Sequence, residues 1–149
     1  MLFGDQTVRA RFAVAVVVML PLVALQGCSG GVRFAPVTGK VTLDGKPVAK
    51  AVVTFNPLPQ PGSDIAGDSA SGTTDENGQY TLKSYVQGDW KDGAQVGKHK
   101  VTISLQESRG EGDRAIIREK LPKNYNRETE LKADVTPGSN HIDFELKSH

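Results

Sequence analysis

The chain of 149 residues contains one cysteine, Cys28, so it cannot close a disulfide within itself. It also lacks an excess of either charge, because 18 basic and 17 acidic residues leave a net charge of +1. That balance excludes the basic surface of a nucleic-acid-binding protein and the acidic block of a solvating tail. Its longest apolar run has 14 residues (12–25), fewer than the about 20 that a membrane-spanning helix needs.

Motifs of several common catalytic and metal sites are missing. The sequence has no P-loop, no G-x-G-x-x-G, no H-E-x-x-H and no H-x-H. His99, His141 and His149 are far apart, and we expect His99 and His141 to be solvated residues at strand ends. The sequence therefore predicts no enzyme, no catalytic residue, no metal and no cofactor.

A group of carboxylates leaves one alternative open. These residues could together offer oxygen ligands to calcium, although the spacing of an EF-hand loop is absent. Their simpler interpretation is as turn and loop formers. The group consists of Asp64, Asp68, Asp75 and Glu76.

Residues 1–27 have the order of a secretory signal peptide. Two arginines give a positive start, the apolar run 12–25 follows, and small residues lead to a cleavage point before Cys28. Pro21 interrupts the apolar run, which disfavours a permanent transmembrane helix. We therefore predict that residues 1–27 are removed and that the mature chain is exported.

Cys28 makes this signal more specific. The stretch Leu25-Gln26-Gly27-Cys28 resembles the lipobox of bacterial lipoproteins, although a small residue is commoner at the position of Gln26. The resemblance implies a diacylglyceryl group on the Cys28 thiol and a new N-terminus acylated with a fatty acid such as palmitate. The alternative is a free buried cysteine, but an unpaired thiol is a liability in an exported protein. Ser29, in place of an aspartate, favours the outer membrane.

The lipid, and not charge, would hold the mature chain to its membrane. Without residues 1–27 the chain has 16 basic and 16 acidic residues, so it gains no attraction to anionic lipid. Two or three acyl chains hold a protein firmly, whereas one holds it weakly. Residues 28–36 are predicted to be the lipidated cysteine and a short tether, whose eight residues after Cys28 span at most about 28 Å.

From residue 37 onward the dominant period is two, which is typical of strands with one buried and one wet face. With a weaker strand over residues 70–74, the pattern predicts about seven strands, the usual number in an antiparallel sandwich. Residues 37–149 are therefore predicted to form a single all-β domain. The residues expected to face its core are Val37, Val41, Leu43, Ala51, Val53, Phe55, Tyr80, Leu82, Val101, Ile103, Leu105, Leu131, Ala133, Val135, Ile142, Phe144 and Leu146.

Turn residues separate these strands. Asp44-Gly45 predicts a two-residue hairpin turn, and Asn77-Gly78 supplies residues that tolerate positive φ. Residues 56–72 and 106–114 are expected to be loops, and residues 113–121 to form a short helical turn.

Residues 83–93 (KSYVQGDWKDG) are the stretch most suggestive of binding. Tyr85 and Trp90 are expected to lie in a polar loop, and Trp90 is the only tryptophan of the chain. An exposed aromatic pair would stack on a sugar or anchor a protein contact. The favoured interpretation is that Trp90 covers the open end of the sandwich, because a lone tryptophan is usually mostly buried.

Three segments in order carry a resemblance to a known domain family. They are VTGKVTLDGKPVAKAVVTFNP (37–57), TTDENGQYTL (73–82) and AQVGKHKVTIS (94–104). Together they resemble the carboxypeptidase regulatory-like domain, a transthyretin-like β-sandwich of Ig-like architecture. Residues 121–146 are similar to the ending of many small predicted lipoproteins of planctomycete-type bacteria. In that family the domain is usually an accessory or structural module.

The resemblance implies no catalytic residues. The related hydroxyisourate hydrolases use histidine, arginine and a serine-containing C-terminal tetrapeptide, whereas this chain ends LKSH. Some surface adhesins form a Lys–Asp isopeptide bond between their first and last strands, where Lys40 and Asp143 stand here. Because Lys40 alternates with Val41, its side chain is expected to face water.

The sequence thus predicts a non-catalytic lipoprotein of the cell envelope, lipidated at Cys28, with Tyr85 and Trp90 as candidate binding residues. Its expected partners are the membrane, through the lipid, and an envelope protein or glycan, with no nucleic acid. The oligomeric state is left open. The first alternative is a carbohydrate-binding module of the envelope, and the second is an accessory domain of an enzyme.

Overall fold

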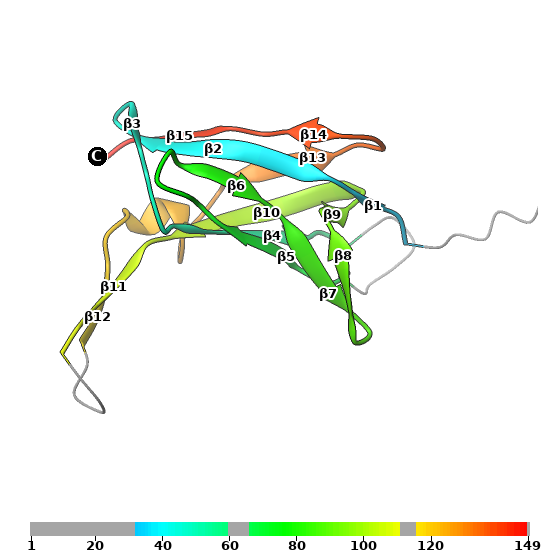
Figure 1. Ribbon diagram of the computed structural model, residues 1–149, viewed down its shortest axis with the longest axis horizontal. Coiled ribbons are helices and arrows are strands. Elements are labelled where there is room, and N and C mark those ends of the chain that lie inside the picture. Colours follow the sequence, from blue (N-terminus) through cyan, green and yellow to red (C-terminus); the bar gives the residue numbers. More distant parts are fainter. Residues whose placement is uncertain (1–31, 60–65, 111–115, 149) are drawn as a thin grey trace, which may run out of the picture. The chain divides into compact units, whose positions relative to one another are not determined.

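The computed structural model describes residues 32–59, 66–110 and 116–148 (Figure 1). These residues are all-β, with fifteen strand segments, one 3₁₀ turn, η2 (Lys123–Tyr125), and no α-helix among them. Most strand pairs are antiparallel, and they form a six-stranded sheet, a five-stranded sheet and two short two-stranded ones. The predicted all-β class is confirmed for this part of the chain.

The six-stranded sheet is antiparallel throughout, in the order β13-β10-β4-β5-β7-β8. β10 and β4 form its centre, and β8 is an edge strand. The predicted weak strand over residues 70–74 is confirmed as β5. The strands are β13 (Lys132–Val135), β10 (Gly97–Ser104), β4 (Val52–Pro57), β5 (Ala70–Thr73), β7 (Lys83–Val86) and β8 (Asp89–Asp92).

The five-stranded sheet is built around β2 (Val37–Leu43). β3 (Lys46–Pro47) and β6 (Gln79–Thr81) pair with β2 in antiparallel fashion. β14 (Asn140–His141) and β15 (Phe144–Leu146) pair with it in parallel. This corrects the expectation of a purely antiparallel arrangement. A parallel partner requires a crossover, and here the chain passes through the other sheet before it returns to β2.

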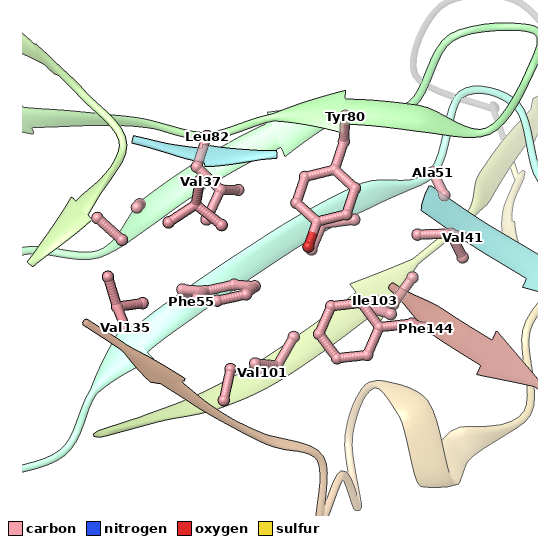
Figure 2. Close-up of a cluster of buried hydrophobic side chains, with 14 of the residues drawn as sticks. Val37, Val41, Ala51, Phe55, Tyr80, Leu82, Val101, Ile103, Val135 and Phe144 are labelled. Atoms are coloured by element: carbon pink, nitrogen blue, oxygen red, sulfur yellow. The ribbon is translucent and has the colours of Figure 1, made fainter. Parts of the chain in front are cut away.

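The buried faces of these two sheets contact each other (Figure 2). Phe55 of β4 meets Phe144 of β15 edge-on, with ring centroids 6.1 Å apart. Tyr80 of β6 stacks on Phe144 at 6.4 Å. The alternation prediction is confirmed, because every residue expected to face the core is either buried or packed against it.

The hairpin predicted at Asp44-Gly45 is confirmed. Leu43 pairs with Lys46, and Asp44 and Gly45 have φ of 50° and 80°, as a two-residue turn of type I′ requires. The returning strand β3 is only two residues long. The chain then leaves for the other sheet, where β4 pairs with β5 and β10.

Two segments expected to be irregular are hairpins instead. β7 and β8 form one, and β11 (Gln106–Arg109) and β12 (Ile116–Glu119) form an arm that projects from the body (Figure 1). β12 overturns the helical turn expected over residues 113–121, because its β-branched isoleucines favour an extended strand. The Glu119 carboxylate closes the base of the arm by accepting the backbone N–H groups of Leu105, Lys120 and Leu121.

Strand pairing starts before residue 37. β1 (Phe34–Ala35) pairs with β9 (Ala94–Gln95), and Ala35 is buried. The folded unit therefore includes residues from the predicted 28–36 tether. Five residues (29–33) lie between Cys28 and the first paired residue, Phe34.

Candidate functional site

The predicted lipidation site lies outside the described residues. Cys28, the whole signal segment 1–27, Asp64 and His149 all fall outside them. Within residues 32–59, 66–110 and 116–148, no helix has the length and apolar character to cross a membrane.

Tyr85 and Trp90, the candidate binding residues, stand directly opposite each other in the β7–β8 hairpin. Their rings pack together with centroids 5.1 Å apart and planes tilted by 57°. Tyr85 is 55% exposed and Trp90 64% exposed. The interpretation of Trp90 as a buried lid is therefore wrong. Trp90 lies on the edge strand β8, all four residues of which are exposed.

The charges of this hairpin are paired within it. Lys91 Nζ lies 2.6 Å from Asp89 Oδ2, and Lys83 Nζ lies 3.8 Å from Asp92 Oδ1. The hydrogen bond and charge of Lys91 hold the pKa of the exposed Asp89 carboxyl below its usual range. These two lysines and two aspartates together have no net charge. The aromatic pair therefore lies on a hairpin whose charged side chains balance one another.

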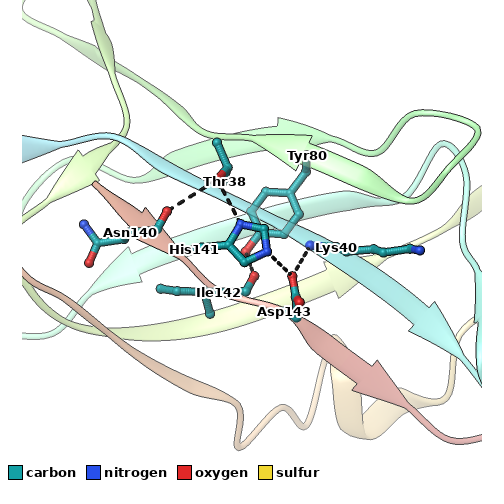
Figure 3. A network of polar contacts seen from close by, with 7 residues as sticks. All are labelled: Thr38, Lys40, Tyr80, Asn140, His141, Ile142 and Asp143. Atoms are coloured by element: carbon teal, nitrogen blue, oxygen red, sulfur yellow. Dashed lines mark hydrogen bonds and ion pairs between the residues drawn. The ribbon is translucent and has the colours of Figure 1, made fainter. Parts of the chain in front are cut away.

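A second cluster lies where the last strands meet β2, and we call it the polar seam (Figure 3). His141 Nδ1 is 3.2 Å from Thr38 Oγ1, and His141 Nε2 is 3.2 Å from Asp143 Oδ1. Asp143 Oδ1 also accepts the Lys40 backbone N–H at 2.7 Å. The polar seam consists of Thr38, Lys40, Tyr80, Asn140, His141, Ile142 and Asp143.

The polar seam replaces one rung of the parallel ladder. The Asn140 and Ile142 N–H groups donate to the Pro36 and Thr38 carbonyls, so the Ile142 carbonyl would next accept the Lys40 N–H. Instead, that carbonyl accepts the Tyr80 hydroxyl at 2.7 Å, and Asp143 takes the Lys40 N–H. This substitution explains the interruption between β14 and β15.

Gly39 makes room for that diverted carbonyl. A Cβ atom at Gly39 would lie 1.7 Å from the Ile142 carbonyl oxygen and 2.9 Å from the Tyr80 ring. No side chain fits there without moving the backbone. Burial, with a smaller contribution from the Asp143 charge, raises the pKa of the Tyr80 hydroxyl above its ordinary value, so it stays a proton donor to Ile142.

The order hydroxyl–imidazole–carboxylate in Thr38, His141 and Asp143 is that of a nucleophile, a general base and an orienting acid. A depression of about 650 Å³ lies over these residues. Acyl transfer also needs free N–H donors aimed at the developing oxyanion. The nearby N–H groups of Lys40 and Ile142 are already bound to Asp143 and Thr38. The contacts that these groups make join β2 to the last strands.

Asp143 reaches the backbone of Lys40 and not its amine. In Figure 3 the Lys40 side chain extends away from the carboxylate. The geometry gives no support to an isopeptide bond between these residues, since the contact that exists joins Asp143 Oδ1 to the Lys40 backbone nitrogen.

His99 is not the solvated residue that the sequence predicts. It is 1% exposed, and its ring lies 5.6 Å from that of Phe55. Nδ1 lies 2.9 Å from the Gly97 carbonyl, while the buried Nε2 has no hydrogen-bond partner among the described residues. Burial lowers the pKa of His99 below its ordinary value. His141, by contrast, has an exposed ring as expected.

Among the described residues, no three His, Cys, Asp or Glu side chains come together as a metal site. Asp75, one of the four carboxylates considered for calcium, forms a turn: its Oδ1 accepts the N–H groups of Asn77 and Gln79, each at 2.8 Å. This contact fits the interpretation of Asp75 as a turn former.

Comparisons with known proteins give no match to a protein-family model, to a curated protein or to a solved structure. The likeness to the carboxypeptidase regulatory-like domain therefore stays a prediction from the quoted sequence segments.

Proposed function

We propose that this chain is a lipoprotein of a bacterial cell envelope, held to a membrane by lipid on Cys28 and carrying a domain that does not catalyse a reaction. The observation that carries the proposal is the order of a positive start, a 14-residue apolar run and Leu-Gln-Gly before the only cysteine. The occupied N–H groups of the polar seam support a structural or binding role over an enzymatic one.

The domain, in this proposal, is a transthyretin-like β-sandwich of about seven principal strands that spans residues 37–149, and β1 extends it by residues 34–35. Two facing sheets with a shared core support the assignment, as do the contacts between Phe55, Tyr80 and Phe144. The sequence segments that resemble carboxypeptidase regulatory-like domains supply β2, β4, β6 and β10.

The test is the intact mass of the native protein extracted from membranes, compared with the Cys28→Ser variant. We expect a mass equal to residues 28–149 plus two or three acyl chains, and loss of that lipid mass in the variant. An unmodified chain, whether uncut or cut elsewhere, would overturn the lipoprotein proposal.

A second candidate function is binding of an envelope glycan. The exposure of Tyr85 and Trp90 favours it, because aromatic rings stack on the apolar faces of sugars. Quenching or a shift of Trp90 fluorescence by cell-envelope polysaccharide would support this candidate. No change across several glycans would remove it.

A further inference from the structure

The chain enters the folded unit at the base of the β7–β8 hairpin. β1 contacts β8, and Gly93, directly after β8, packs on Ala35 so closely that a Cβ there would lie 1.8 Å from the Ala35 carbonyl oxygen. Figure 1 shows β1 and the hairpin at one end of the described unit, with the β11–β12 arm and the C-terminus at the other. The aromatic pair therefore stands at the same end of the described unit as β1.

The reach of the tether is similar in scale to the length of the hairpin. Five residues (29–33) separate Cys28 from Phe34, so the two Cα atoms lie at most about 21 Å apart. The four residues of β8 extend over about 13 Å. A lipid on Cys28 would thus keep the tip of the hairpin within reach of the membrane surface.

The exposed side chains at this end suit a bilayer interface. Tyrosine and tryptophan favour the headgroup level, where an apolar ring and a polar group are both accommodated. Val32, 61% exposed, adds an apolar side chain at the end of the tether. Lys83 and Lys91 match Asp89 and Asp92 in number, so these four residues add no net charge at this end.

We propose that the β7–β8 hairpin is a membrane-contact element, with Tyr85 and Trp90 in the headgroup region of the membrane that holds the Cys28 lipid. This inference rests on the lipoprotein function proposed above. The hairpin would fix the orientation of the domain, with the β11–β12 arm directed away from the bilayer. A glycan site is the weaker assignment, because the hairpin's four charged groups already pair with one another instead of converging on the rings.

Trp90 makes the proposal directly measurable, since it is the only tryptophan in the chain. The lipidated native protein is reconstituted into phosphatidylethanolamine–phosphatidylglycerol vesicles with and without bromine on the acyl chains. We expect brominated lipid to reduce Trp90 emission at least twofold, and vesicles to reduce its quenching by iodide.

The matched control moves the reporter to the other end of the unit. In the double variant Trp90→Phe with Ile117→Trp, the tryptophan replaces an isoleucine that is 65% exposed on β12. We expect brominated lipid to leave its emission unchanged. Equal quenching at both positions would overturn the fixed orientation and with it the proposal.

The mass of the same preparation separates the two proposals. A chain that carries lipid and floats with vesicles, but whose Trp90 is not quenched, overturns the membrane-contact proposal alone. If that Trp90 instead responds to cell-envelope polysaccharide, the glycan candidate replaces it. A chain without lipid on Cys28 that stays behind when vesicles float overturns both proposals.

Discussion

The polar seam and the β7–β8 hairpin join strands in opposite ways. In the polar seam, a regular ladder is interrupted, and the side chains of Tyr80 on β6 and of Asp143 between β14 and β15 replace the missing rung. In the hairpin, the pairing is regular from Lys83–Asp92 to Val86–Asp89, and its aromatic side chains point to solvent. The polar seam, where pairing is irregular, thus has side chains that contact one another closely. The β7–β8 hairpin, where pairing is regular, has side chains that are free to contact a partner.

We infer from this difference that the polar seam stabilises the fold, whereas the β7–β8 hairpin is available for contact with partners. A buried hydroxyl, a diverted carbonyl and a glycine without room for a methyl group depend on one another in the polar seam. The exposed rings of Tyr85 and Trp90 depend mainly on each other. Substitutions in the first region should cost stability, whereas those in the second should leave the fold intact.

The largest effect is expected from Gly39→Ala. The new methyl group would overlap the Ile142 carbonyl oxygen, so the strand must shift and the Tyr80 contact must break. We expect the free energy of unfolding in urea, followed by circular dichroism, to fall by about 3 kcal/mol or more.

Gly88→Ala is the control for that substitution. Gly88 has φ of 91° in the hairpin turn, but no atom lies within 4 Å of a Cβ built there. Only the backbone conformation is penalised, so we expect a loss of about 1 kcal/mol. Equal losses in the two variants would contradict the crowding at Gly39.

Tyr80→Phe is expected to have the next largest effect. It removes the hydroxyl while keeping the ring on Phe144, and it leaves the Ile142 carbonyl without its donor. We expect a loss of about 1–3 kcal/mol in the free energy of unfolding. Tyr85→Phe, which changes an exposed ring, should have no measurable effect. A neutral Tyr80→Phe variant would show that the lost ladder bond forms again between Ile142 and Lys40.

The hydrophobic alternation made the core predictable, because successive side chains of a strand point to opposite faces. The same alternation also indicates the burial of His99 and the exposure of Tyr85, which the sequence analysis did not predict. His99 shares its parity with Val101 and Ile103, which places it inside. Tyr85 has the opposite parity from the buried Leu82 and Ser84, which places it outside, and Trp90 lies directly across from it.

The polar seam could not be derived in this way. Thr38 and His141 are 103 residues apart, and Tyr80 and Ile142 are 62 apart. No local pattern states that the last strand lies parallel to β2, and the contacts depend on that pairing. Gly39 in the V-x-G-x-V segment indicates that another backbone segment approaches closely. The sequence does not identify that segment as the Ile142 carbonyl.

A smaller and pH-dependent effect is expected from His99. Its folded pKa is lowered by burial, against opposing contributions from the Gly97 carbonyl and the Asp134 charge. Below about pH 6.5 the unfolded chain binds a proton that the folded chain does not, so stability is lost as the pH falls towards the folded pKa. The measurement is the free energy of unfolding in urea between pH 8 and pH 5.

Two variants identify the residue responsible. His99→Phe should flatten the pH dependence above pH 5, because no buried imidazole remains to titrate. His141→Gln, which removes an exposed ring, should leave the loss of stability at low pH in place. A slope that disappears only with His141→Gln would contradict the assignment to His99.

The smallest effect is expected from Trp90→Ala. The side chain is 64% exposed and packs mainly on Tyr85, so the free energy of unfolding should fall by less than about 1 kcal/mol. A double-mutant cycle with Tyr85→Ala should give a coupling of about 0.2–1 kcal/mol for the cross-strand pair. A loss above about 2 kcal/mol would be that of a core tryptophan and would restore the interpretation of Trp90 as a lid. A small loss would mean that the domain folds without the contact between the two rings. Both rings would then be available to contact an external surface.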